Sequence, residues 1–208
     1  MSSLWVHPGG DSILVFQNRQ VNFLTSDGKV DLYAYNINQD TILWRTDDIT
    51  ANGNSSIQPP IVYEDKVYFQ GGFYISCFDA LTGELIWMRD DFSARSEHFF
   101  VSNMVAADGI LAAKADNDFL FGYDANTGET IWKQTDVGAS SSEMIYHDGK
   151  VYYTAGKLYA IDIRTGNIHW ALSSPNPNTG FSAGVAIDKT FNYLYANDRF
   201  YAMCIRLD

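Results

Sequence analysis

Short runs of alternating apolar and polar residues recur along the chain, separated by tight polar turns. In one example, residues 158–163 lead through Arg164-Thr165-Gly166-Asn167 to Ile-His-Trp, which ends at Trp170. Alternation with a period of two predicts strands. In an Asp-x-x-Thr-Gly turn, the Asp carboxylate can accept turn amides and the Gly can adopt a positive φ, which favours a hairpin. No window shows a convincing helical period, so the pattern predicts an all-β chain.

This pattern occurs four times, and each copy ends in a tryptophan: Trp44, Trp87, Trp132 and Trp170. The turn aspartates are Asp79, Asp124 and Asp162, and the turn glycines are Gly83, Gly128 and Gly166. The first copy departs from the pattern, with Asn36 and Gln39-Asp40 in its turn. A pair of strands joined by an Asp-centred turn precedes each copy. Four strands per unit and a period of about 40 residues are typical of propeller blades.

The spacing predicts a single domain with the fold of a five-bladed β-propeller, built from four-stranded antiparallel blades. The predicted blades are 11–47, 57–90, 100–136, 140–173 and 181–208. The fifth stops before any Trp-bearing strand, whereas the segment 3–6 has the Leu-Trp ending of such a strand and carries Trp5. We therefore expect the N-terminal strand 3–6 to complete the last blade and close the ring, which removes exposed sheet edges. The alternative is a fragment of a larger propeller that begins with a leftover strand.

The segment 158–170, with its Asp-x-x-Thr-Gly-x-x-x-Trp motif, resembles the repeat of the PQQ-like, or quinoprotein-type, β-propellers. The resemblance extends over nearly the whole chain. It implies either a quinone-dependent dehydrogenase or a cofactor-free scaffold. The dehydrogenases are much longer, with eight blades, a disulfide between adjacent cysteines and a calcium site that have no match in this sequence. We therefore expect the scaffold branch, with no cofactor and with Cys77 and Cys204 as free, mostly buried thiols.

The composition limits the partners. Asp and Glu number 25 against 14 Lys and Arg, for a formal net charge of −11. This charge argues against nucleic acid and anionic membranes, because both favour a basic protein face. We also expect no membrane span, no signal peptide within this chain and no metal, since the Cys and His residues lack ligand spacing. The family resemblance implies a periplasmic or secreted protein, which we expect to be a monomer.

Two sets of residues are candidate binding sites. The first is a polar ring at the channel mouth, formed by serines at one register of the predicted first strands: Ser12, Ser102, Ser142 and Ser182. The second is an acidic interaction face, formed by residues that follow the outer strands: Asp47, Asp48, Asp90, Asp91 and Asp136. The alternatives are small residues at strand ends and an ordinary solvated rim. The G-x-S-x-G match at 180–184 lacks the strand–turn–helix context of a nucleophile, so we expect no catalytic residue.

These features favour a non-enzymatic scaffold that binds a protein partner through one loop face or the channel mouth. A propeller that binds a small ligand or a carbohydrate in pockets between blades is the alternative. A quinone-dependent oxidoreductase is a third hypothesis.

Overall fold

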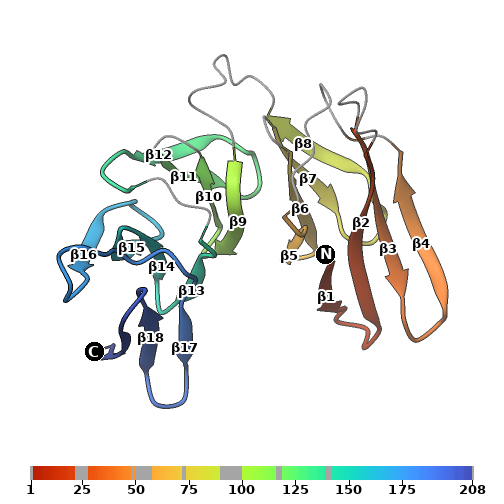
Figure 1. The fold of residues 1–208 in the computed structure, drawn as a ribbon. Coiled ribbons are helices and arrows are strands. Elements are labelled where there is room, and N and C mark those ends of the chain that lie inside the picture. Colours follow the sequence, from red (N-terminus) through yellow and green to blue (C-terminus); the bar gives the residue numbers. More distant parts are fainter. Residues whose placement is uncertain are drawn as a thin grey trace. The chain divides into compact units, whose positions relative to one another are not determined.

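The computed structural model describes residues 2–21, 28–47, 49, 58–71, 74–89, 100–115, 119–138 and 142–207. All the regular elements in this part of the chain are β-strands (Figure 1). They form five sheets, which divide between two compact units, Met1–Phe100 (unit 1) and Val101–Asp208 (unit 2). Among the described residues, no helix has the length and hydrophobicity needed to cross a membrane.

Unit 1 holds two four-stranded meanders, with the orders β1-β2-β3-β4 and β5-β6-β7-β8. The bounds are β1 Ser2–Val6, β2 Ser12–Val21, β3 Gly28–Asn36, β4 Thr41–Thr46, β5 Ile61–Tyr63, β6 Lys66–Gln70, β7 Ile75–Asp79 and β8 Leu85–Arg89. The two sheets share one core, in which Val15, Leu32 and Trp44 of the first sheet cluster with Val67 and Phe78 of the second. Apolar residues therefore bury one face of each sheet against its neighbour.

Unit 2 holds two further four-stranded sheets and one sheet of three described strands. The bounds are β9 Phe100–Ala107, β10 Ile110–Ala115, β11 Leu120–Asp124, β12 Thr130–Gln134, β13 Ile145–His147, β14 Lys150–Ala155, β15 Lys157–Asp162, β16 Ile168–Ser173, β17 Ala186–Asp188, β18 Tyr193–Asn197 and β19 Ala202–Arg206. The middle strands of the sheet β13–β16, β14 and β15, are buried on both faces. In this sheet, Tyr153 packs in a cluster with Trp132, and Tyr152 packs in another cluster with Leu194.

The N-terminal strand lies in the first sheet rather than the last. β1 pairs antiparallel with β2, and Trp5 lies opposite Ile13. The connecting turn is tight, since the amide of His7 donates to the carbonyl of Asp11 at 2.8 Å. The last sheet, β17-β18-β19, contains no contribution from β1. The prediction that 3–6 completes the last blade is therefore wrong. A strand joined by a short turn pairs with its sequence neighbour at a much lower loop-closure cost than with a distant strand.

The repeated tryptophans occupy one position in their sheets. On the fourth strand, each lies opposite a small third-strand residue, and the pairs are Ala34–Trp44, Cys77–Trp87, Gly122–Trp132 and Ala160–Trp170. Two of the rings also join neighbouring sheets. Trp44 Nε1 donates to the carbonyl of Ala80 at 2.9 Å, and Trp132 Nε1 donates to that of Ile163 at 2.8 Å. Small residues leave room for the ring, which then packs against the turn of the next sheet.

Candidate functional site

In each four-stranded sheet, the turn between the first and second strands and the turn between the third and fourth strands lie at one end, which we call the turn end. In the turns between third and fourth strands, one Asp oxygen accepts two turn amides at 2.8 to 3.0 Å, as the sequence predicts for Asp79, Asp124 and Asp162. The turn glycines Gly83, Gly128 and Gly166 have φ angles of 73°, 74° and 71°. The sequence motif therefore fixes these turns in one conformation.

The backbone conformation of the turns between first and second strands also favours Asp. Asp65, Asp108 and Asp148 have φ angles of 58°, 54° and 47°. Among residues with a β-carbon, Asp and Asn tolerate this left-handed region best. Turn geometry therefore places acidic side chains at the tips of these hairpins.

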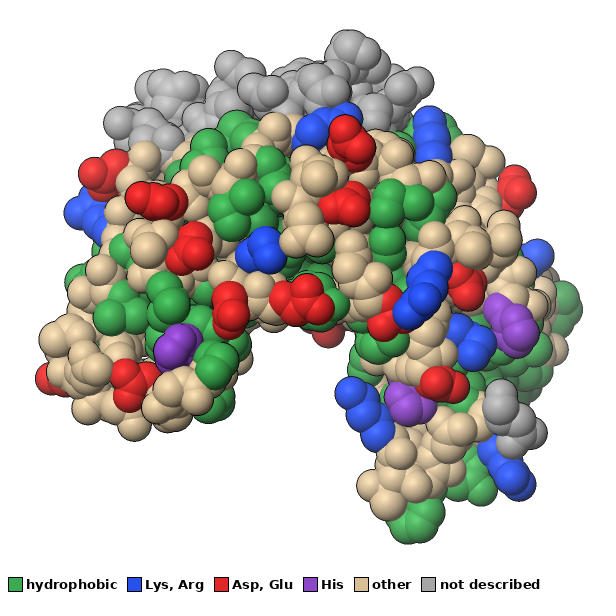
Figure 2. Space-filling model, turned by 180° about the vertical axis from the view of Figure 1, so that it is seen from behind, with side chains coloured by type: hydrophobic (Ala, Val, Ile, Leu, Met, Phe, Trp, Pro, Cys, Tyr) green, Lys and Arg blue, Asp and Glu red, His purple; other side chains and the backbone are tan. Residues whose placement is uncertain are grey.

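As a result, the turn end of unit 1 is strongly acidic. Its described carboxylates are Asp11, Asp40, Glu64, Asp65, Asp79 and Glu84, and its described basic side chains are Lys66 and His7. Figure 2 shows exposed acidic side chains, in red, on the face that it presents. The Trp44 ring, on β4, bonds to Ala80 in the β7–β8 turn, so the turn ends of the two sheets lie on one side of unit 1. Negative potential is concentrated there.

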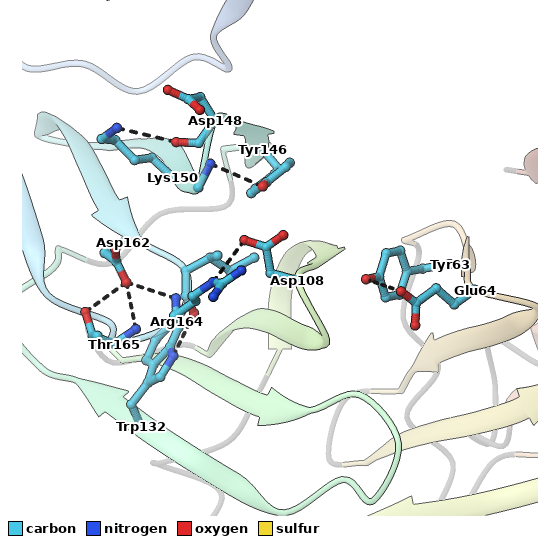
Figure 3. Close-up of polar contacts among 12 residues, drawn as sticks. Tyr63, Glu64, Asp108, Trp132, Tyr146, Asp148, Lys150, Asp162, Arg164 and Thr165 are labelled. Atoms are coloured by element: carbon cyan, nitrogen blue, oxygen red, sulfur yellow. Dashed lines mark hydrogen bonds and ion pairs between the residues drawn. The ribbon is translucent and has the colours of Figure 1, made fainter. Parts of the chain in front are cut away.

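The turn end of unit 2 is also continuous from sheet to sheet. Arg164, in the β15–β16 turn, forms an ion pair with Asp108, in the β9–β10 turn, at 3.2 Å (Figure 3). His147 and Asn192 form a hydrogen bond of 2.8 Å between the β13–β14 and β17–β18 turns. This turn end mixes charges, because Lys150 and Arg164 accompany its acids. It is therefore a weaker candidate for binding a basic partner than the turn end of unit 1.

Hydrogen bonding sets the charge state of the turn aspartates. Burial by itself would raise the pKa of Asp79, but bonds from the amides of Thr82 and Leu81 and from the Thr82 hydroxyl outweigh burial and lower it. Asp162 behaves in the same way, with its pKa lowered by bonds from Thr165 and Arg164 against the effect of burial. Both side chains are therefore firmly ionised at neutral pH.

The acidic face that we expected after the outer strands is only partly described. Asp47 follows β4 in unit 1 and forms an exposed ion pair with Arg45 at 2.7 Å. Asp136 follows β12 in unit 2 and is exposed. The positions 48, 90 and 91, which are Asp48, Asp90 and Asp91, lie outside the described residues. The acidic face formed by these five residues therefore stays a prediction.

Sequence reasoning treated the turn aspartates as structural and missed the acidic turn end. The signal was present, because the turns between first and second strands and between third and fourth strands carry carboxylates, and in an antiparallel four-stranded sheet these two turns lie at the same end. We therefore take the turn end of unit 1 as the better candidate for an acidic surface.

The predicted serine ring is not uniform. Ser12 lies on β2, the second strand of its sheet, because the His7–Asp11 turn precedes it. Ser102 and Ser142 are buried. The hydroxyl of Ser102 donates to the carbonyl of Ser142, and the hydroxyl of Ser142 donates to the carbonyl of Thr154 at 2.6 Å. Ser182 precedes β17 and is exposed. The alignment was wrong at Ser12, and the two buried hydroxyls bond to backbone.

The G-x-S-x-G match is explained by close backbone packing. Gly156 and Phe181 exchange two backbone hydrogen bonds, of 2.8 and 3.0 Å. A β-carbon at Gly180 would lie 2.7 Å from the carbonyl oxygen of Gly156, so this glycine allows the two segments to meet. Both cysteines are free thiols. Cys77 is buried, whereas Cys204 is exposed, which corrects the expectation that both are mostly buried.

Repeated four-stranded sheets with a tryptophan on the fourth strand and an Asp-x-x-Thr-Gly turn define a β-propeller of PQQ-like repeats. Residues 71–204 match the family model described as outer membrane protein assembly factor BamB. Because the match covers more than half of the chain, the protein belongs to this family of PQQ-like repeat propellers. Comparison with curated proteins by sequence gives no match.

Solved structures agree with this fold. BamB from Moraxella catarrhalis is 15% identical with a TM-score of 0.69, over 89% of this chain and 52% of that one. The computationally designed Ika8 protein is 14% identical with a TM-score of 0.68, over 98% of this chain and 57% of the Ika8 chain. Quinohemoprotein alcohol dehydrogenase from Comamonas testosteroni is 17% identical with a TM-score of 0.59, over 70% of this chain and 29% of the dehydrogenase chain. The chain thus spans about half the length of the first two structures. At such low identities these similarities establish the fold alone.

Proposed function

We propose that the protein is a non-enzymatic scaffold that binds a partner protein with a basic surface through the turn end of unit 1. The proposal is supported by membership of a family described as an outer membrane protein assembly factor. The observation that carries it is the accumulation of carboxylates, from Asp11 to Glu84, on a turn end whose described residues include a single lysine, Lys66.

The backbone under these carboxylates is firmly held. The amide of Ala80 donates to the carbonyl of Asp65 at 2.9 Å, and the Ala80 carbonyl accepts from Trp44. The Glu64 carboxylate accepts from the Tyr63 hydroxyl at 2.7 Å (Figure 3). A prearranged surface loses little conformational entropy when a partner binds. Its charge attracts Lys and Arg side chains and selects against acidic partners.

The test compares the two ends of the sheets with equal changes of charge. The turn-end variant is Glu64→Gln, Asp65→Asn and Glu84→Gln, and the opposite-end variant is Asp47→Asn, Asp136→Asn and Glu143→Gln, three exposed carboxylates away from the turns. The probe is an immobilised lysine-rich peptide at low and physiological salt. We expect the turn-end variant to bind about tenfold more weakly, while the opposite-end variant changes affinity less than about twofold. Equal affinity for all three proteins, or loss only in the opposite-end variant, contradicts the proposed surface.

We further propose that the five sheets are successive blades of one propeller and that the protein is a monomer without cofactor in the periplasm or outside the cell. Light scattering of the purified protein tests the monomer. Fractionation of the source cells tests the compartment. A visible absorbance band of a bound quinone in the purified protein would contradict the cofactor-free proposal and favour an oxidoreductase.

A further inference from the structure

A cavity of about 530 Å³ opens within unit 2, between the β14–β15 turn and the segment that follows β16. Its polar lining residues are Lys157, Tyr159, Ser173, Ser174, Asn176 and Thr179. The volume lies in the range of small-molecule sites in proteins, roughly 300 to 1,000 Å³. All of the lining belongs to unit 2, so the cavity is built by one compact body.

One wall of this cavity is held by a buried carboxylate. Oδ2 of Asp198 accepts from the hydroxyls of Ser174 and Thr179, the second at 2.9 Å. Oδ1 accepts from the amides of Phe200 and Tyr201 at 2.7 and 2.6 Å. Asp198 is only 6% exposed, and four donors satisfy its charge. The segment 174–179 is therefore fixed from behind, and the Asp198 charge is largely used in fixing it.

The opposite wall is fixed by the backbone. Gly156 takes a φ of 69° and exchanges two hydrogen bonds with Phe181. Lys157 and Tyr159 follow on β15, where the Tyr159 ring stacks on that of Tyr153 with centroids 6.0 Å apart. Both walls are thus positioned before any ligand binds, which lowers the entropic cost of binding.

The polar atoms that remain available in the cavity are mainly donors. They are the Lys157 ammonium, the Tyr159 and Ser173 hydroxyls and the side-chain amide nitrogen of Asn176. Within the described part of the chain, none of these four groups donates a hydrogen bond to another residue. The hydroxyls of Ser174 and Thr179 already donate to Asp198, and Ser174 Oγ also accepts from the amide of Asn176 at 3.0 Å, so these two oxygens offer only their remaining lone pairs. The cavity therefore offers several donors, including one cation, beside two acceptors.

We infer that this cavity binds a small hydroxylated carboxylate, of the class of a monosaccharide acid. The carboxylate would accept from Lys157 and from the hydroxyl and amide donors near it, since charge-assisted hydrogen bonds are the strongest of these contacts. The ligand hydroxyls would donate to the lone pairs of Ser174 and Thr179. This site is separate from the proposed protein-binding surface on unit 1 and does not rest on that proposal.

The experiment is a calorimetric titration of the full chain with sodium D-glucuronate, alongside methyl glucoside as the neutral sugar. We expect saturable binding of glucuronate and affinity at least tenfold lower for methyl glucoside. Lys157→Met should weaken glucuronate binding at least tenfold. Lys150→Met is the matched control, because Lys150 lies on β14 outside the cavity lining, and it should bind like the parent.

Tyr159→Phe is a second variant, which removes one donor and keeps the buried ring. We expect it to weaken binding about threefold to tenfold with an unchanged melting temperature, so that loss of affinity is separated from loss of folding. The inference is overturned if glucuronate gives no saturable heat, if methyl glucoside binds equally well, or if Lys157→Met binds like Lys150→Met.

Discussion

The ring of Trp132 lies directly over Gly166 of the neighbouring sheet. A β-carbon built on Gly166 would lie 2.6 Å from Cδ2 of that ring, well inside van der Waals contact. Nearby, the Trp132 indole nitrogen donates to the carbonyl of Ile163, in the same turn. The tryptophan and the glycine of the repeat therefore form one contact that joins the fourth strand of one sheet to the turn of the next. The same arrangement recurs between Trp44 and Gly83.

This contact predicts that Gly166→Ala costs more stability than an alanine in an equally left-handed turn. Gly149 is the matched control, because its φ is 73° against 71° for Gly166 and a β-carbon there would meet no atom within 4 Å. Both substitutions carry a backbone cost of roughly 1 kcal/mol. Gly166→Ala adds a steric cost of roughly 1–3 kcal/mol from displacement of the Trp132 ring.

Urea unfolding followed by tryptophan fluorescence measures both variants. Equal midpoints for Gly166→Ala and Gly149→Ala would show that the ring does not restrict this turn. Trp132→Phe in the Gly166→Ala background supplies a further check, since a smaller ring should recover part of the steric cost.

Because of the hydrogen-bonded carboxylate of Asp198, we expect the stability of unit 2 to depend on pH in the acid range. Bonds from the Ser174 hydroxyl and from the amides of Phe200 and Tyr201 lower the pKa of Asp198 to about 2, against the opposing effect of burial. A carboxyl group with a lowered folded-state pKa stabilises the fold above its unfolded pKa. That stabilisation is lost as the pH falls from about 4 to about 2.

Urea midpoints measured from pH 7 to pH 2 check this prediction. Asp198→Asn should lower the midpoint at pH 7 and flatten the decline below pH 4, because the variant has no carboxylate to protonate. Asp136→Asn is the control, since Asp136 is exposed and its substitution should leave the profile unchanged. An Asp198→Asn profile parallel to that of the parent would contradict the prediction.

The sequence predicted the sheets where local pattern and local chemistry agree. The turn formed by Asp162 and Gly166 follows from the bonds of one carboxylate and the φ freedom of one glycine. The position of β1 did not follow, because the Leu-Trp ending at Trp5 resembles a fourth strand, whereas the tight turn after it decides the pairing. The cavity beside Lys157 could not be predicted either. Its walls come from two segments, and they meet through Gly156, which no motif marks, and Phe181, whose G-x-S-x-G match does not indicate this contact.

We expect the Ser102 side chain to stabilise the contact between adjacent sheets. It is fully buried and its hydroxyl donates to the carbonyl of Ser142, in the segment before β13. Ser102→Ala removes this buried hydrogen bond, which costs about 1–2 kcal/mol. Ser182→Ala, at an exposed position of the same predicted ring, should change stability by less than about 0.5 kcal/mol. Chemical unfolding of the two variants gives the comparison, and equal effects would remove the distinction between buried and exposed serines.

We expect the thiols of the two cysteines to react with modifying reagents at very different rates. Cys77 is buried opposite Tyr68, and burial raises its pKa to about 12, only partly opposed by Lys66. Cys204 lies opposite Tyr195 at the same register of the last sheet, but it is exposed. The thiolate is the reactive form, so at pH 8 the deprotonated fraction of Cys77 is roughly 1 in 10,000.

We expect a disulfide reagent such as DTNB to label Cys204 within minutes and Cys77 only after unfolding. Cys204→Ser should abolish the fast phase and leave a single slow one. A fast phase that persists in Cys204→Ser would mean that the sheet β5–β8 opens readily enough to expose Cys77.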